Sequence, residues 1–186
     1  RHGLLVAGHL PVRVPLGMAI AAGQHSVEHP RIFLFECYRG AAGFRALPDP
    51  IAAYTADMRL RFIDEHDPVR CAELMAAMAA SDTWWTPTLQ VLRMSALAGN
   101  REFREDPRRR YIPFILWAGL WQPDADRAAA HARHASGRDV DAELYRLAMD
   151  NVRQAHAAGV RIVAGTDAGD TYVFPGFAIH DELAEL

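Results

Sequence analysis

Short apolar runs alternate with longer amphipathic segments along this chain, and the alternation predicts strands separated by helices. Four runs have the length and composition of buried strands, and each is bounded by glycine, proline or polar residues. They span residues 4–9, 26–29, 83–89 and 160–167. A strand followed by a helix, repeated four times, is typical of parallel βαβ units.

Two of the intervening helices have clear start and stop signals. Asp67 followed by Pro68 is a favourable N-cap and first helical residue, and Ser81–Asp82 breaks the apolar spacing that follows. A longer helix is predicted over 139–158, with an apolar stripe along one face and Gly159 as its stop. A short helical segment over 16–23 ends in the same way at a glycine.

The number of predicted strands sets the architecture. A closed eight-stranded parallel barrel typically needs about 250 residues, whereas this chain has 186 and four predicted strands. We therefore expect an α/β fold that forms about half of a TIM-type (β/α)8 barrel over 1–186. The chain enters an apolar run within three residues of Arg1 and ends where 181–186 opens a helix. We expect it to be a piece of a larger protein.

Composition removes several classes of function. The chain is 51% hydrophobic and 23% charged with a formal net charge of -3, which indicates a globular protein without a basic stripe for nucleic acid. Its apolar runs are too short for a membrane span. All 20 basic residues are arginine. A mechanism that needs a lysine nucleophile, Schiff base or carbamylated lysine cannot be completed from this chain alone.

The two cysteines carry little weight in the sequence. Cys37 and Cys71 are too few for a disulfide framework. Cys71 falls within a helical pattern and is predicted to be a small buried hydrophobe. The pair leaves the cellular compartment open.

Three of the predicted strands end in a residue that can bind a metal: His9, His29 and Asp167. In parallel α/β folds the carboxyl ends of the strands face the active site. Two imidazoles and a carboxylate are ligands that a hydrolytic zinc site uses. Taken singly, a histidine after a strand is more often a hydrogen-bonded turn residue, so the combination carries the hypothesis.

The order of the motifs adds a resemblance. Gly-His at 8–9, Ser-Val-Glu-His at 26–29 and Gly-Thr-Asp-Ala-Gly at 165–169 resemble the second half of the amidohydrolase superfamily, and the middle of the chain matches it loosely. The chain looks most like the subgroup of imidazolonepropionase-like enzymes and metal-dependent prolidases. This implies the C-terminal half of the barrel, strands 5 to 8, with an N-terminal half outside this sequence.

The resemblance also implies roles for individual residues. His9 and His29 would hold one divalent metal, zinc by expectation, and Asp167 would bind the second metal of the family site and act as general acid and base. His180 would lie on the substrate side, with capping of the last helix as the alternative. Tyr172, in the loop after Asp167, is predicted to contact substrate because loops at that end shape the pocket.

The implied reaction is hydrolysis of a C–N bond in an amide, a cyclic amide or an Xaa-Pro dipeptide by metal-activated hydroxide. The chain departs from the family pattern because it has neither the His-x-His pair of the first strand nor the bridging lysine. The rival hypothesis is therefore a catalytically incomplete half-barrel with an association role only. Expected partners are a small-molecule or dipeptide substrate and either further copies of the chain or a complementing N-terminal half, with no nucleic acid and no membrane.

Other clusters are interpreted as structural. His25 is predicted to be structural, and His131 and His134 to lie on a solvated helix face. The mixed charges of 101–110 predict a salt-bridged surface. Three aromatic residues at helical spacing are predicted to be core, with an apolar lid over the substrate as the alternative: Phe114, Trp117 and Trp121.

Overall fold

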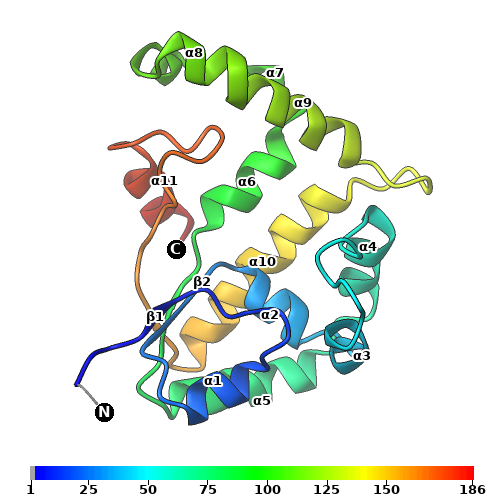
Figure 1. Cartoon of the computed structure of the whole chain (residues 1–186), viewed down its shortest axis with the longest axis vertical. Helices are drawn as coiled ribbons and strands as arrows, with labels where there is room; N and C mark the ends of the chain where they lie inside the picture. The colour runs from blue at the N-terminus through cyan, green and yellow to red at the C-terminus, as the bar shows by residue number, and fades with distance from the viewer. Residues whose placement is uncertain (1–2) are drawn as a thin grey trace.

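A four-stranded, all-parallel sheet with helices packed around it organises the chain, as seen in a computed structural model that describes residues 3–186 (Figure 1). The strands follow one another in space in the order β1-β2-β3-β4. Their bounds are Ala7–Gly8 (β1), Ser26–Glu28 (β2), Trp84–Thr86 (β3) and Arg161–Ile162 (β4). The predicted α/β alternation with parallel strands is confirmed.

The register of the sheet aligns the strand ends. Gly8 pairs with Val27, Val27 with Trp85 and Trp85 with Ile162, so these residues form one row across the sheet. Because all the strands run in the same direction, whatever follows this row emerges at one edge. That edge is where the sequence analysis places its candidate ligands.

The strands are shorter than the apolar runs that predicted them. Leu4, Leu5 and Val6 were expected in a buried strand, but their side chains are 83%, 72% and 61% exposed, so that prediction is wrong. Within residues 3–186, β1 is hydrogen-bonded to β2 alone and lies at an open edge of the sheet. The strand β3 is also shorter than predicted. It stops before Pro87, which cannot donate to the ladder, and Leu89 already belongs to the next helix.

Five helices separate the first three strands. The fifth starts as predicted, with the Asp67 carboxylate accepting hydrogen bonds from the backbone N–H groups of Val69 and Arg70. These helices are Leu16–Ala21 (α1), Arg31–Glu36 (α2), Ala41–Arg45 (α3), Ala56–Asp64 (α4) and Pro68–Ala79 (α5).

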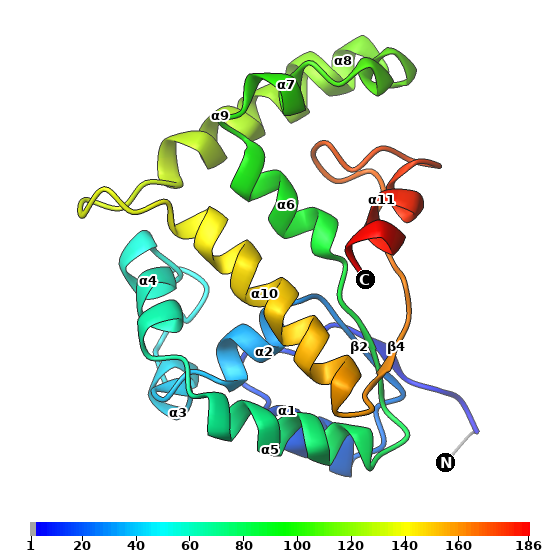
Figure 2. The same ribbon diagram turned by 180° about the vertical axis from the view of Figure 1, so that it is seen from behind.

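The segment between β3 and β4 is almost entirely helical. Residues 101–131 of this segment form an arm at the top of Figure 1. It comprises Leu89–Leu97 (α6), Arg101–Arg104 (α7), the 3-10 turn Pro107–Tyr111 (η1), Phe114–Leu116 (α8), the π-helical turn Trp117–Trp121 (η2), Gln122–His131 (α9) and Val140–Ala157 (α10). The chain closes with Ala178–Glu185 (α11). Figure 2 shows α6 and α10 side by side, in agreement with their contacts.

The helix α10 is the centre of the packing, since it contacts α2, α4, α5 and α6. Its predicted bounds are confirmed: Asp139 caps it by accepting from the N–H of Ala142, and Gly159 follows it with φ of 88°. Its apolar face packs into the main core beside Trp85, whose ring meets Phe33 edge-on at 4.7 Å between centroids.

A second, smaller core lies under the arm. Trp121 is fully buried there, with Tyr172 and Phe174 against it. The core prediction is therefore confirmed for Trp121 but wrong for Phe114, which is 76% exposed because it starts the short turn α8 at the tip of the arm.

Cys37 and Cys71 form a disulfide, which corrects the expectation that Cys71 is an unpaired buried residue. The side chain of Cys71 is buried as predicted. What the sequence does not reveal is the approach of two distant segments: the N–H of Asp67 donates to the carbonyl of Cys37 at 2.8 Å, and Tyr38 forms an isolated antiparallel bridge with His66. These contacts bring the first turn of α5 to the end of α2.

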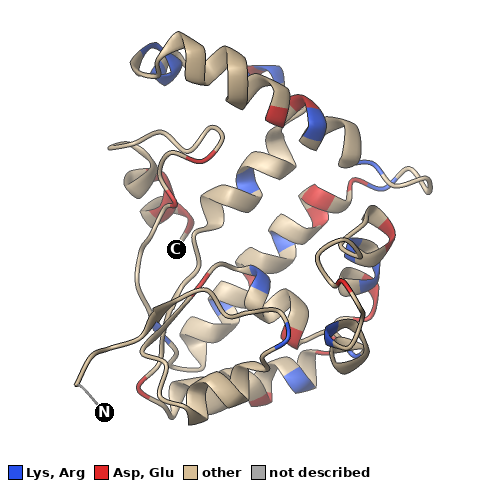
Figure 3. Cartoon of the chain, viewed as in Figure 1, with Lys and Arg blue, Asp and Glu red and all other residues tan. Residues whose placement is uncertain are grey.

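Charged residues of both signs lie interspersed along the helices (Figure 3). In the predicted salt-bridged surface, Arg101 pairs with Glu105, Arg104 with Asp126, and Arg108 with Asp106 and Asp181. Across residues 3–186, no helix combines the length and the apolar character needed to cross a bilayer.

Removing the cap of α10 tests its place in the fold. We expect Asp139→Ala to lower the free energy of unfolding by about 1 kcal/mol, because the N–H of Ala142 loses its acceptor. Urea denaturation measures this change. Asp150→Ala, which removes an exposed ion pair with Arg153 on the same helix, is the matched control and should change stability by less than about 0.5 kcal/mol. Equal effects of the two substitutions would contradict the capping role.

Candidate functional site

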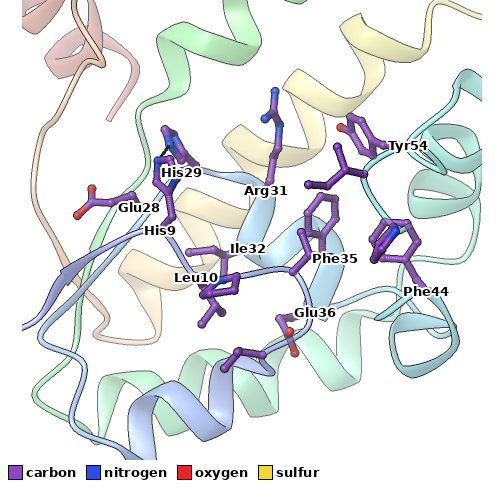
Figure 4. Close-up of a pocket in the computed structure, with 15 residues that line it drawn as sticks. His9, Leu10, Glu28, His29, Arg31, Ile32, Phe35, Glu36, Phe44 and Tyr54 are labelled. Carbon is purple, nitrogen blue, oxygen red and sulfur yellow. Dashed lines mark hydrogen bonds between the residues drawn. The ribbon is translucent and has the colours of Figure 1, made fainter. Parts of the chain in front are cut away.

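The imidazoles of His9 and His29 meet at the carboxyl edge of the sheet. Their Nε2 atoms lie 2.7 Å apart and their ring centroids 4.5 Å apart. His9 directly follows β1 and His29 directly follows β2, so the parallel pairing of these strands brings together two residues that are 20 positions apart. Figure 4 shows the two rings against each other at the mouth of a cavity.

His29 is the hub of the cluster. Its Nδ1 shares a hydrogen bond with the hydroxyl of Thr88 at 2.7 Å, and its Nε2 lies 3.8 Å from Oδ2 of Asp167. Thr88 follows β3 and Asp167 lies beyond β4. Each of the four strands therefore leads to one of these side chains at the same edge.

The backbone at this edge is unusual. His29, Thr88 and Asp167 adopt positive φ values of 75°, 49° and 57°. A left-handed conformation costs an L-residue roughly 1–2 kcal/mol, and a β-branched residue such as threonine adopts it least readily. Thr88 and Asp167 both lie against His29, and three such residues together indicate that the surrounding structure imposes the conformation, which is a common feature of functional sites.

Several contacts hold His29 in place. Its backbone N–H donates to the carbonyl of Thr86 at 2.9 Å, and its own carbonyl accepts from the indole Nε1–H of Trp85 at 3.0 Å. Trp85 is fully buried, so this indole is a rigid support. The sequence analysis assigned Trp85 only to a strand, and no sequence signal pointed to its hydrogen bond.

Thr88 is supported from the opposite side. The carboxylate of Glu182, which is completely buried in α11, accepts hydrogen bonds from the N–H groups of Leu89 and Gln90 at 2.9 and 3.2 Å. A side chain from the last helix thus caps α6 directly after Thr88. Burial raises the pKa of the Glu182 carboxyl, and the two backbone donors oppose that shift.

Gly165 allows the segment after β4 to approach β3. A Cβ atom at this position would lie 2.3 Å from Cγ2 of Thr86 and 3.5 Å from Cγ2 of Thr88. The glycine of the Gly-Thr-Asp-Ala-Gly motif is therefore required by close packing, and this packing directs the following residues toward His29.

Burial lowers the pKa of His29 below its ordinary value of 6.5, and the nearby His9 and Arg31 lower it further. Asp167 and Glu28 act in the opposite direction. His29 is therefore neutral at pH 7 and keeps a nitrogen lone pair. Since the unfolded-state pKa is higher, the stability that this shift contributes is present above about pH 6.5 and is lost as the pH falls through the folded-state pKa.

A cavity of about 340 Å³ opens beside the two histidines. Figure 4 shows aromatic and aliphatic side chains around it, together with the guanidinium of Arg31 and the carboxylates of Glu28 and Glu36. This guanidinium lies 5.8 Å from the centre of the Tyr54 ring. No sequence signal pointed to this cavity, because its walls combine α2 and α3 with the segment after β1 and the irregular segment that leads to α4. The main lining residues are Leu10, Arg31, Ile32, Phe35, Phe44 and Tyr54.

The two predicted substrate-binding residues lie elsewhere. Tyr172 is only 5% exposed and packs in the second core against Trp121, so its ring is not available to a substrate. His180 is exposed on α11, and within residues 3–186 no hydrogen bond or ion pair joins it to His9, His29 or Asp167. The alternative role of His180 as a helix cap is wrong, because α11 begins at Ala178 and Phe177 occupies the N-cap position.

The donor set suits a divalent cation in part. Two imidazoles bound to one zinc ion at about 2.0–2.1 Å stand about 3.3 Å apart in tetrahedral geometry, so a small rotation of the exposed His9 ring would accommodate an ion. The carboxylate is less closely placed: over the part of the chain described, the ligand atoms of His9, His29 and Asp167 do not all lie within 4.8 Å of one another. The geometry fits a histidine pair with a nearby carboxylate better than a closed three-ligand site.

Comparisons with protein-family models, with curated proteins and with solved structures found no match to this chain. The geometry of the site is therefore the basis for assigning a function.

The electrostatic environment of His29 predicts two opposite shifts. We expect Asp167→Asn to lower the pKa of His29 further, because a stabilising negative charge is lost, and His9→Gln to raise it, because a destabilising neighbour is lost. Titration of the imidazole signals by NMR measures both shifts. His180→Gln is the control and should leave the pKa of His29 unchanged. Shifts of the same sign for Asp167→Asn and His9→Gln would show that the cluster is not assembled as described.

The close approach at Gly165 predicts a steric penalty. We expect Gly165→Ala to destabilise the chain by about 1–3 kcal/mol, because the new methyl group overlaps Cγ2 of Thr86. Adding Thr86→Ser, which removes that methyl group, should recover most of the loss in urea denaturation. Gly17→Ala in α1, where a Cβ meets nothing within 4 Å, is the control and should be neutral or slightly stabilising. If the double variant is no more stable than Gly165→Ala, the two segments do not pack as described.

Proposed function

We propose that this chain supplies the metal-binding edge of an amidohydrolase-type hydrolase that cleaves a C–N bond. The observation that carries the proposal is the convergence of His9, His29 and Asp167, which follow three different strands, on one edge of a parallel sheet. The strained backbone at His29 and Asp167 adds support, because strain of this kind concentrates at functional sites. In this proposal the sheet is the C-terminal half of a TIM-type barrel.

His9 and His29 would hold a divalent ion, zinc by the chemistry of the donors, through their facing Nε2 atoms. Such an ion would supply electrostatic activation of water, lowering its pKa to about 7. With the ion on Nε2, His29 would donate its Nδ1–H to the hydroxyl of Thr88, which fixes the orientation of the ring in the usual arrangement for a histidine ligand. Because the pKa of His29 is lowered, its ring is neutral at pH 7. With the single ring proton on Nδ1, Nε2 keeps the lone pair that binds the ion.

Asp167 is the proton carrier in this proposal. Its side chain is half exposed and its carboxylate lies 3.8 Å from Nε2 of His29, so it can reach a water molecule between them. There it accepts a proton as general base and returns it to the leaving nitrogen as general acid. The adjacent cavity would take the substrate side chain against its largely apolar wall, which also carries the guanidinium of Arg31 and the carboxylates of Glu28 and Glu36. An amide, a cyclic amide or an Xaa-Pro dipeptide fits this description.

The second candidate is a half-barrel whose role is association alone. The exposed apolar residues Leu4, Leu5 and Val6 beside β1 favour it, because an open strand edge next to apolar side chains is a surface for pairing with another chain. The family's His-x-His pair and lysine do not occur in this sequence. Under either candidate, we propose that a further segment or a second chain completes the barrel.

Metal analysis of the disulfide-bonded chain separates the two candidates. After dialysis against zinc, we expect about one zinc ion per chain, and we expect His29→Ala to lose it, because the hub of the cluster is gone. His156→Ala, which removes an exposed histidine of α10, is the matched control and should retain the ion. Atomic absorption measures the zinc content. A chain that stays free of zinc, or a loss that is equal in the control, would leave association as the supported role.

A further inference from the structure

A second cluster of metal-binding side chains lies away from the carboxyl edge of the sheet. The sulfur atoms of Cys37 and Cys71 and a ring nitrogen of His66 all lie within 4.8 Å of one another. Cys37 follows α2, Cys71 belongs to the first turn of α5, and His66 precedes that helix. The two sulfurs are joined in a disulfide, so in this oxidised state they cannot bind an ion.

His66 is the unexplained member of this cluster. Its Nδ1 is shielded from solvent and has no hydrogen-bond partner among the residues described. Burial lowers the pKa of its imidazole, so the ring is neutral and has a free lone pair. A buried polar atom without a partner costs free energy and calls for a function or an occupant. The disulfide beside it satisfies neither nitrogen of the ring.

Backbone contacts other than the disulfide also hold the three ligands together. The N–H of Asp67 donates to the carbonyl of Cys37, Tyr38 forms a backbone bridge with His66, and the Asp67 carboxylate caps α5. These contacts fix the backbone on both sides of the cluster. Both sulfurs are fully buried, whereas His66 is partly exposed and gives the cluster a path to solvent.

We propose that reduction of the Cys37–Cys71 disulfide converts this cluster into a binding site for a zinc-type ion, with two thiolates and the His66 imidazole as ligands. The spacing supports this: tetrahedral zinc bonds of about 2.3 Å to sulfur and about 2.0–2.1 Å to nitrogen separate the ligand atoms by about 3.5–3.8 Å. These separations are shorter than 4.8 Å, the limit within which the three ligand atoms now lie. Only the two sulfurs, which are now bonded to each other, must move apart. The fourth position is left to water. The site is independent of the proposed hydrolase.

The conversion is a two-electron step. A phosphine reductant breaks the S–S bond, is oxidised to the phosphine oxide with the oxygen of a water molecule, and leaves both sulfurs as thiols with the two protons of that water. Binding of the ion displaces these two protons into the buffer, because the thiolate is the ligand form. Oxidation by a disulfide oxidant reverses the step and releases the ion. The cluster thus holds either a disulfide or a metal.

Cobalt(II) is a suitable probe, because its charge-transfer absorption in the near ultraviolet reports sulfur ligands and ignores a histidine–carboxylate site. After phosphine reduction, we expect the 186-residue chain to bind about one thiolate-ligated cobalt ion, which zinc displaces. The oxidised chain should show no such band. His66→Ala should weaken cobalt binding at least about tenfold, whereas His156→Ala and His29→Ala should leave the band and the affinity unchanged.

Three results would overturn the proposal. One is a reduced chain that keeps its far-ultraviolet circular dichroism but shows no sulfur-to-cobalt band. Another is an unchanged affinity in His66→Ala, which would mean that the thiols bind the ion without the imidazole. The third is a reduced chain that loses its circular dichroism and does not regain it when cobalt is added. Loss of zinc from the disulfide-bonded His29→Ala chain tests the other site and bears on none of these outcomes.

Discussion

The meeting of two imidazoles at a sheet edge depends on the parallel register of β1 and β2. Gly8 opposite Val27 places the next residues of both strands beyond the last shared row, and His9 and His29 turn toward each other there. An antiparallel pairing would put these residues at opposite ends of the sheet, and a shift of one residue would turn one imidazole to the other face. Every other feature of the candidate site is arranged around this contact.

The surrounding structure explains how such a strained edge can persist. His29, Thr88 and Asp167 have left-handed backbones, and the first two are tied to well-packed parts of the fold. Trp85 anchors the carbonyl of His29 from the main core, and Glu182 caps the helix that follows Thr88. The core and the last helix therefore act as supports for a small group of polar side chains, which is how rigid scaffolds hold functional residues.

Local signals in the sequence predicted the ends of two helices well, whereas the predicted strands were too long. Asp67 and Asp139 identified two helix starts, and glycine at 159 identified a stop, because capping depends on a few neighbouring residues. The sequence could not reveal contacts between distant segments: the disulfide, the Trp85 hydrogen bond and the burial of Tyr172 all depend on how helices pack. For the same reason the apolar run at 4–6 was wrongly placed in a buried strand, since its exposure depends on what lies beside it.

The most direct test of the central claim is anomalous X-ray diffraction at the zinc absorption edge from crystals of the disulfide-bonded chain grown with zinc. The account predicts a strong anomalous peak within about 2.0–2.2 Å of Nε2 in both His9 and His29, on the side that faces Asp167. A map with no peak at this edge, or imidazoles that point away from each other, would contradict it.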